Sequence, residues 1–249
     1  LRDHPAAQTD FANIRDLDKD PIVVWQDKYY LVLVLLMNVA VPLYLGALAG
    51  DAIGGLLLIG FLRVVVCHHT TFFINSLAHF WGRQPYSDRN SAKDNALIAL
   101  LTYGEGYHNY HHTFQWDYRN GIRWYHFDPS KWLIAALEKC RLASNLKVAA
   151  PELIEKSLAA MQLKNATEKL RRFNTINTEK WLALLDDEYE QLVSKINEWS
   201  HLRQHWMDLK RADLRRRWDE TELANKLHEL ETELDIQRQQ WRMLTQQFA

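Results

Sequence analysis

The chain has 249 residues and a formal net charge of −1, so its length allows one domain or two. A charge this close to neutral gives no bulk attraction to a polyanion, and we expect no nucleic-acid partner. Two cysteines, Cys67 and Cys140, are too few for a disulfide framework and are typical of reduced thiols.

Two long apolar runs follow one another early in the chain, separated by the pair Gly50-Asp51. The first run, residues 30–49, is uncharged, and about 20 residues are enough to cross a hydrocarbon core of about 30 Å. The second run, residues 52–67, carries one charge, Arg63, whose long side chain we expect to reach the membrane interface. The pattern predicts a transmembrane helical hairpin, and a buried hairpin of a soluble protein is the alternative.

Basic residues flank this hairpin, whereas its turn carries only Asp51. The flanking basic residues are Lys19, Lys28, Arg63, Arg83 and Arg89. By the positive-inside rule, both ends of the hairpin face the cytoplasm. The residues that follow the hairpin are therefore expected on the cytoplasmic side.

Polar residues of a possible site begin where the second run ends. Asn75 and His79 are four positions apart, so an amide and an imidazole lie on one face of a helix. Residues 88–102 predict a short amphipathic helix, which brings the next segment back toward His79. That segment, residues 104–112, reads Gly-Glu-Gly-Tyr-His-Asn-Tyr-His-His.

The three histidines of this segment indicate a metal site. On a helical turn His108 shares a face with His111 and His112, so the imidazoles can converge on one ion. Histidine nitrogens with few thiols nearby favour iron or zinc. Solvent-exposed loop histidines are the alternative. His126 lies among aromatic residues and is interpreted as structural.

The character of the chain changes after residue 143. From Glu152 onward there is no glycine or proline, and large apolar residues recur in alternating steps of three and four. They are Leu223, Leu227, Leu230, Leu234, Trp241, Leu244 and Phe248, with Gln237 filling one position. The spacing predicts a soluble coiled coil or helical bundle over residues 144–249, with a break at 174–178. We expect residues 178–249 to serve self-association or partner docking.

Taken together, the motifs of residues 1–143 resemble those of the integral-membrane acyl-CoA and acyl-lipid desaturases, in particular the Δ9 stearoyl-CoA desaturase type. The likeness covers about residues 21–132 and rests on three stretches. They are Asn-Ser-Leu-Ala-His-Phe-Trp-Gly at 75–82 with Gln-Pro-Tyr at 84–86, the histidine segment at 104–112, and Trp-Asp-Tyr-Arg at 116–119. The resemblance implies a mainly α fold, in which a membrane hairpin carries a cytoplasmic histidine-rich cap.

The resemblance also implies a chemistry and a set of residues. In the resembled family, nine histidines surround two irons that activate dioxygen, and the resulting oxidant removes hydrogens from adjacent methylenes of a long acyl chain. By this likeness the metal ligands are His79, His108, His111 and His112, with Asn75 holding a metal-bound water. Glu105 is a candidate to orient an imidazole, and Thr71 and Phe72 match positions that line the bend of the acyl tunnel.

The implied partners are a long-chain fatty acyl substrate, O2, membrane lipid and a separate electron donor, which is a ferredoxin, cytochrome b5 or a reductase. The chain has no haem or ferredoxin cysteine pattern of its own. We expect an integral membrane protein of a bacterial inner membrane.

One departure from the family pattern bears on activity. Two earlier histidine boxes, which supply five ligands, are missing, since His4 is the only histidine before His68. Four histidines cannot saturate two irons, so we expect a C-terminal part of a desaturase that is inactive alone, with its remaining ligands upstream. Two alternatives remain: a membrane histidine-box hydroxylase, and a non-enzymatic, membrane-anchored helical interaction module.

Overall fold

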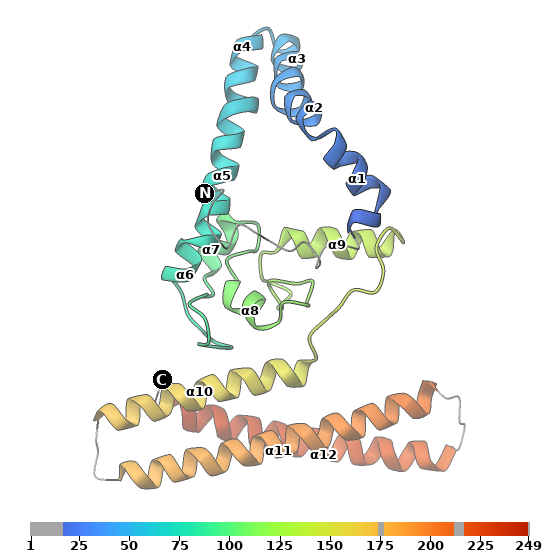
Figure 1. Ribbon diagram of the computed structural model, residues 1–249. Coiled ribbons are helices and arrows are strands. Elements are labelled where there is room, and N and C mark those ends of the chain that lie inside the picture. Colours follow the sequence, from blue (N-terminus) through green and yellow to red (C-terminus); the bar gives the residue numbers. More distant parts are fainter. Residues whose placement is uncertain (1–16, 174–176, 212–216, 249) are drawn as a thin grey trace. The chain divides into compact units, whose positions relative to one another are not determined.

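The computed structural model describes residues 17–173, 177–211 and 217–248, and over these residues it is mainly helical (Figure 1). The mainly α fold expected from the sequence is confirmed. The chain forms two compact units, Leu1–Thr71 and Phe72–Ala249, each with its own internal packing.

The first arm of the hairpin is a succession of short helical segments. They are η3 (Leu17–Lys19), α1 (Pro21–Lys28), α2 (Tyr30–Leu35), the π-helical η4 (Leu36–Ala40) and α3 (Val41–Leu48). Asp20 starts α1, because its carboxylate accepts hydrogen bonds from the backbone N–H groups of Ile22 at 2.8 Å and Val23 at 3.4 Å.

The second arm consists of α4 (Ala52–Gly55), the π-helical η5 (Leu56–Leu62) and α5 (Arg63–Asn75). The arms meet backbone to backbone, since a Cβ atom on Gly46 would lie 2.6 Å from the Cα of Gly55. Small residues permit this close approach between helices in a membrane.

Arg63 and Asn38 join the two arms through their side chains. Arg63 donates hydrogen bonds to the Asn38 side-chain oxygen and, at 2.9 Å, to the Ile59 carbonyl. The Asn38 amide in turn donates to the Val34 carbonyl at 2.8 Å. Arg63 is thus held against the facing arm, where the sequence had suggested an extension to the interface. Hydrogen bonding of this kind offsets the cost of a polar group in an apolar span.

Tyr30–Leu48 and Ala52–Phe80 are long and apolar enough to cross a membrane, and 11% of each apolar window is buried. A hairpin in a soluble core would bury most of these side chains, so their outward orientation favours the transmembrane alternative. The second helix continues beyond the predicted end at residue 67. In the continued part Thr70 and Thr71 donate hydrogen bonds to the Cys67 carbonyl, at 2.8 and 2.9 Å, so both hydroxyls are satisfied within the helix.

The histidine-rich cap is built from short helices and ordered loops. Its helices are α6 (Leu77–Phe80), α7 (Ala96–Leu101), α8 (His108–Thr113) and α9 (Pro129–Lys139). The helix predicted over residues 88–102 is wrong for residues 88–95. The side chain of Asn95 accepts hydrogen bonds from the first N–H groups of α7, so the helix begins only at Ala96.

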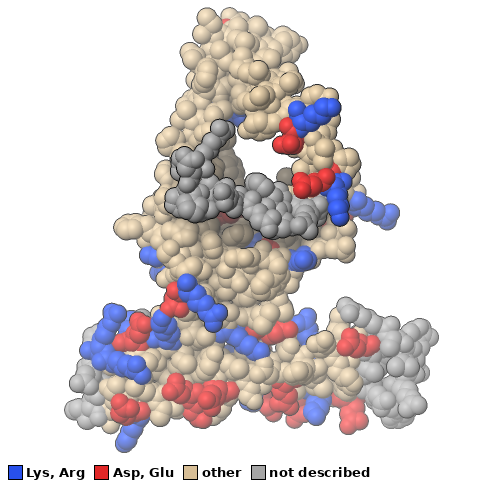
Figure 2. Space-filling model, viewed as in Figure 1, with Lys and Arg blue, Asp and Glu red and all other residues tan. Residues whose placement is uncertain are grey.

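The C-terminal region is a three-helix bundle of α10 (Pro151–Phe173), α11 (Thr178–Arg211) and α12 (Arg217–Gln246), as Figure 1 shows. The predicted helical bundle is confirmed. Of the break predicted at 174–178, residues 174–176 lie outside the described residues. The buried core of the bundle contains Ala159, Ala166, Leu170, Leu185, Leu192, Ile196, Leu234 and Trp241. Charged side chains gather over this bundle in Figure 2, in keeping with a solvated outer surface.

The start of α10 shares a small core with the cap. Ile154 and the preceding Ala149 pack with Tyr110 and Phe114, and all four are buried. The bundle is therefore anchored beside α8, the helix that carries the clustered histidines. The predicted domain boundary between residues 143 and 144 stays a prediction.

Candidate metal centre

Three histidine side chains from two helices converge in the cap. His79 lies on α6, and His108 and His112 lie one turn apart on α8. The Nε2 atom of His108 is 3.1 Å from that of His79 and 3.1 Å from that of His112. One ligand atom from each of the three residues lies within 4.8 Å of the others. The structure thus brings together residues that are 29 positions apart in the sequence.

The two 3.1 Å separations from the His108 nitrogen fit a shared metal ion. Metal–nitrogen bonds of about 2.1 Å place neighbouring ligands roughly 3.0–3.4 Å apart, depending on the coordination geometry. A donor set made only of imidazole nitrogens suits iron or zinc. Among the described residues, Nδ1 of buried His108 has no hydrogen-bond partner, while its Nε2 faces the other two imidazoles.

The imidazoles of His108 and His112 are in the protonation state that a metal needs. Burial, together with His112, His79 and His111, lowers the pKa of His108 to about 4. Burial, followed by His111 and His79, lowers the pKa of His112 as well. Neutral imidazoles with free lone pairs are therefore the state of both residues at neutral pH.

Asp94 fixes the first turn of α8. Its carboxylate accepts hydrogen bonds from the backbone N–H groups of Asn109 at 2.7 Å and Tyr110 at 3.1 Å. These N–H groups have no partner within the helix, so an acidic side chain at this end is stabilising. Burial raises the pKa of Asp94 to about 6, although the two hydrogen bonds oppose that shift.

Gly104 and Gly106 lie where the backbone has no room for a larger residue or adopts a conformation that favours glycine. Gly104 has a φ of +107°, a backbone conformation that residues other than glycine rarely adopt. A Cβ atom on Gly106 would lie 2.6 Å from the Cα of Ala99 in α7. The backbone that leads into His108 is therefore pressed directly against α7, which sets where α8 begins.

The other predicted site residues are less tightly grouped. The His111 ring lies 6.0 Å from the His108 ring and 5.7 Å from the His112 ring, centroid to centroid, outside the three-histidine cluster. Asn75 is exposed at the end of α5. Glu105 accepts a 2.8 Å hydrogen bond from the Asn120 amide. The metal-related roles of these three residues stay predictions.

The two predicted tunnel residues lie on α5. Thr71 points its hydroxyl at the helix's own backbone, and the Phe72 ring is 61% exposed. The tunnel role of both residues stays a prediction.

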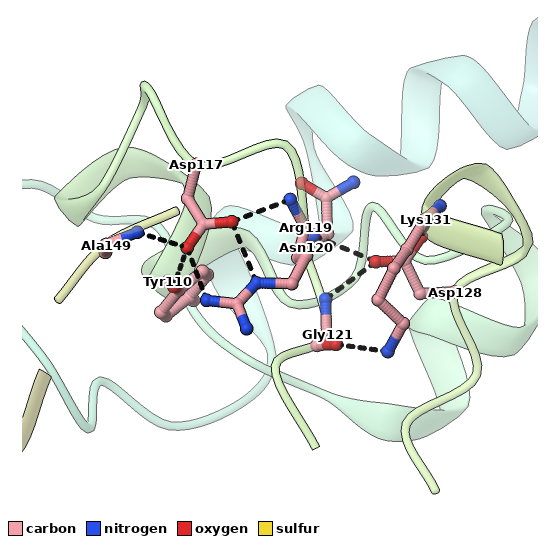
Figure 3. Close-up of polar contacts among 8 residues, drawn as sticks. All are labelled: Tyr110, Asp117, Arg119, Asn120, Gly121, Asp128, Lys131 and Ala149. Atoms are coloured by element: carbon pink, nitrogen blue, oxygen red, sulfur yellow. Dashed lines mark hydrogen bonds and ion pairs between the residues drawn. The ribbon is translucent and has the colours of Figure 1, made fainter. Parts of the chain in front are cut away.

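Figure 3 shows two buried polar clusters that sequence reasoning missed. In the first, the Asp117 carboxylate accepts hydrogen bonds from the Tyr110 hydroxyl at 2.6 Å and from the Arg119 guanidinium at 2.7 and 3.0 Å. It also accepts one from the Ala149 N–H at 2.8 Å. This single carboxylate thereby joins α8 to the segment that leads into α10.

In the second cluster, buried Asp128 accepts hydrogen bonds from the N–H groups of Asn120 and Gly121, both at 2.9 Å, and caps α9 (Figure 3). The Lys131 ammonium donates to the Gly121 carbonyl. The cluster positions Asn120, which in turn holds Glu105. The Trp-Asp-Tyr-Arg stretch at 116–119 was the sequence signal closest to these clusters, but it carried no information on their partners.

A cavity of about 490 Å³ lies beside the cluster, between the cap and α10. His112 forms part of its wall, together with Tyr86, Arg89, Met161 and Lys164. Solvent therefore reaches at least one imidazole of the cluster within this unit.

Comparison with known proteins adds an independent observation. The family model described as fatty acid desaturase matches residues 6–141. Acyl-CoA desaturase 1 of Saccharomyces cerevisiae is 42% identical over 164 residues, which are 66% of this chain and 32% of that protein. A probable acyl-CoA desaturase of Schizosaccharomyces pombe is 42% identical over 154 residues, 61% of this chain and 32% of that protein.

Stearoyl-CoA desaturase 5 of Bos taurus is 37% identical over 145 residues, which are 57% of this chain and 43% of that protein. The chain spans between about a third and somewhat less than half of the length of these relatives. The likeness includes the cap with all three clustered histidines.

Proposed function

Because the chain belongs to the fatty acid desaturase family, we propose that it forms the C-terminal part of an oxygen-dependent di-iron enzyme that introduces a double bond into a fatty acyl chain. The convergence of the His79, His108 and His112 Nε2 atoms carries the proposal. Nitrogen ligands that leave coordination positions open suit iron–oxygen chemistry.

In this proposal the residues of the chain bind the metal and orient its ligands. His79, His108, His111 and His112 would hold iron, and Asn75 would hold a water molecule at the metal. When bound, iron supplies the oxygen chemistry that removes hydrogens from unactivated methylenes, which no side-chain acid or base does at neutral pH. Asp94 keeps α8, and with it three of these imidazoles, in place through its backbone contacts.

The acyl chain is proposed to lie along Thr71 and Phe72, and Glu105 is proposed to support the ligand shell. Glu105 is itself held by Asn120, so its carboxylate has a fixed position near the start of α8. We propose the Δ9 position for the double bond, from the resemblance to the stearoyl-CoA type.

The three clustered histidines, even with His111, are too few ligands for two irons. We therefore propose that the remaining ligands lie upstream in the full protein and that this chain alone has no desaturase activity. The proposed partners are a long-chain fatty acyl substrate, O2, membrane lipid and a separate electron donor. The cytoplasmic orientation and a bacterial inner membrane stay predictions.

The test is a chimera. The part of Saccharomyces cerevisiae acyl-CoA desaturase 1 that matches this chain is replaced by residues 1–249, and the fatty acids of cells that lack other desaturase activity are analysed. We expect new monounsaturated acids with the double bond at Δ9. The chimera with His108→Ala is the matched control and should make none, while the chain expressed without the upstream part should make none either.

Each other product pattern favours an alternative. Hydroxylated acids in place of alkenes would identify a histidine-box hydroxylase. A chimera that is stably inserted and yet binds no iron would contradict the enzyme proposal and favour a membrane-anchored interaction module. Double bonds made by residues 1–249 alone would overturn the proposal that the chain is inactive by itself.

A further inference from the structure

The second nitrogen of His79 has a defined partner. Nδ1 of His79 lies 2.9 Å from the hydroxyl oxygen of Ser91, while Nε2 faces His108 at 3.1 Å. A neutral imidazole has one N–H group, and the hydrogen bond of one nitrogen determines which nitrogen carries the proton. If the Ser91 oxygen accepts from Nδ1–H, then Nε2 keeps its lone pair directed at the cluster.

Ser91 belongs to a loop, residues 83–94, that is fixed to the helix of His79. The backbone N–H of Lys93 donates to the Ala78 carbonyl at 2.8 Å, and the Lys93 ammonium donates to the Phe80 carbonyl at 2.8 Å. Ala78 and Phe80 flank His79 in the chain. The loop is therefore attached to α6 at the residues directly before and after His79, the residue that Ser91 contacts.

The same loop is fixed to the helix of the other two histidines. Fully buried Asn109, next to His108 on α8, donates hydrogen bonds from its amide to the carbonyls of Ser87 at 2.6 Å and Ala92 at 3.0 Å. Its side-chain oxygen accepts from the N–H groups of Tyr86 at 2.9 Å and Ser87 at 3.3 Å. The loop thus joins α6 to α8, and Ser91 lies where the two attachments meet.

We propose that Ser91 is a positioning residue, which holds His79 in the Nδ1–H form and turns its Nε2 toward His108 and His112. The proposal rests on the metal site of the proposed function. It assigns Ser91 no contact with substrate or with the ion, because its hydroxyl acts only through the imidazole. Hydrogen-bond partners of this kind typically contribute 10–100-fold to metal affinity.

The test compares Ser91→Ala with Ser91→Thr, which keeps a hydroxyl, and with Ser87→Ala, which removes a hydroxyl from the same loop. The Ser87 hydroxyl accepts from the Arg89 N–H at 3.2 Å, so it has a local partner away from the histidine pair. All variants are made in the full 249-residue chain in detergent. Co²⁺ affinity is followed by the visible absorption of the ion. The ¹⁵N signals of His79, assigned from their loss in His79→Gln, report the tautomer without metal.

We expect Ser91→Ala to bind Co²⁺ about 10–100-fold more weakly and to lose the single Nδ1–H signal pattern of His79. Ser91→Thr and Ser87→Ala should retain both. Unchanged affinity and unchanged ¹⁵N signals in Ser91→Ala would overturn the role of Ser91. If the unmodified chain binds no Co²⁺, the proposed metal site fails, and the ¹⁵N comparison still decides whether Ser91 sets the tautomer.

Discussion

The hydroxyl of Tyr110 donates a 2.6 Å hydrogen bond to the carboxylate of Asp117, whose side chain is completely buried. Tyr110 stands between the clustered histidines of α8, and Asp117 also binds the Ala149 backbone ahead of α10. The ligand-bearing helix and the bundle are therefore connected through one ionised group.

Replacing Asp117 tests this connection. Asp117→Ala leaves the Arg119 guanidinium and the Ala149 N–H without their acceptor, and we expect a loss of about 3–5 kcal/mol in the free energy of unfolding. Tyr110→Phe removes one hydrogen bond and should cost about 1 kcal/mol. Thermal unfolding in detergent, followed by tryptophan fluorescence, measures both. Equal effects of the two substitutions would contradict a central role of the carboxylate.

The stability loss caused by Asp117→Ala should depend on pH. Burial raises the pKa of Asp117, but hydrogen bonds from Arg119 and Tyr110 outweigh burial and lower it below the ordinary value. A carboxylate with a lowered pKa stabilises the folded state above its unfolded pKa of about 3.9, and that stability is lost as the pH falls. The deficit of Asp117→Ala should therefore be full at pH 7 and shrink below about pH 4.

Gly106→Ala tests the close approach of the histidine segment to α7. The added Cβ meets the backbone of Ala99, which cannot rotate away as a side chain can. We expect a loss of about 1–3 kcal/mol or more in stability, from overpacking. The exposed Gln115→Ala is the control and should change stability by less than about 0.5 kcal/mol. A stable Gly106→Ala protein with unaltered Co²⁺ binding would show that this contact does not set the position of α8.

His126 makes the protein sensitive to acid. Its ring stacks on Tyr107 at 4.3 Å, centroid to centroid, and burial, with Arg123 and Lys131, lowers its pKa to about 4. Between that value and the unfolded value of about 6.5, the unfolded chain binds the extra proton, so stability falls as the pH drops through this window.

His126→Phe keeps a stacking ring and removes the titration. We expect the variant to lose less stability than the parent between pH 6.5 and pH 4, in thermal unfolding at a series of pH values. All other residues are the same in the two proteins, so their contributions cancel in the comparison. Identical pH profiles of the two proteins would show that protonation of His126 does not lower the stability of the folded state.

Gln237 is the polar residue in the apolar stripe of α12. It is 5% exposed and donates a 2.8 Å hydrogen bond to Glu188 of α11. Gln237→Leu should raise the stability of the bundle by about 1 kcal/mol, because Glu188 can turn to solvent while the core gains apolar contact. Exposed Gln240→Leu is the control and should leave stability within about 0.5 kcal/mol. Light scattering on both variants shows whether the buried amide also restricts self-association, as buried polar residues do in coiled coils.

The histidines of α8 should not be equivalent in metal binding by this chain. His112→Ala removes one of three converging nitrogens, whereas His111→Ala removes a ring outside the cluster. We expect Co²⁺ binding to be lost in the first variant and to change by less than about threefold in the second, because His111 is proposed to bind iron only together with the ligands that are proposed to lie upstream. Loss of binding in both variants would show that His111 turns inward when the ion binds.

Patterns that repeat within one helix could be predicted from the sequence. The two apolar arms, the shared face of His108 and His112, and the stripe through Leu234 and Trp241 all depend on a local period, and the structure contains each of them. The family likeness came from short motifs of the same local kind.

Contacts between distant segments were decided by tertiary structure alone. Residues 88–95 were predicted as helix and form instead the loop that places Ser91 against His79. The pairing of Arg63 with Asn38, and of Asp117 with Tyr110 and Ala149, was equally outside any local pattern. Periodicity reports which residues share a face of one helix, because it follows from backbone geometry. The pairing of buried donors with acceptors depends on how distant segments pack. It is decided by the whole fold, in which all the buried polar groups must find partners together.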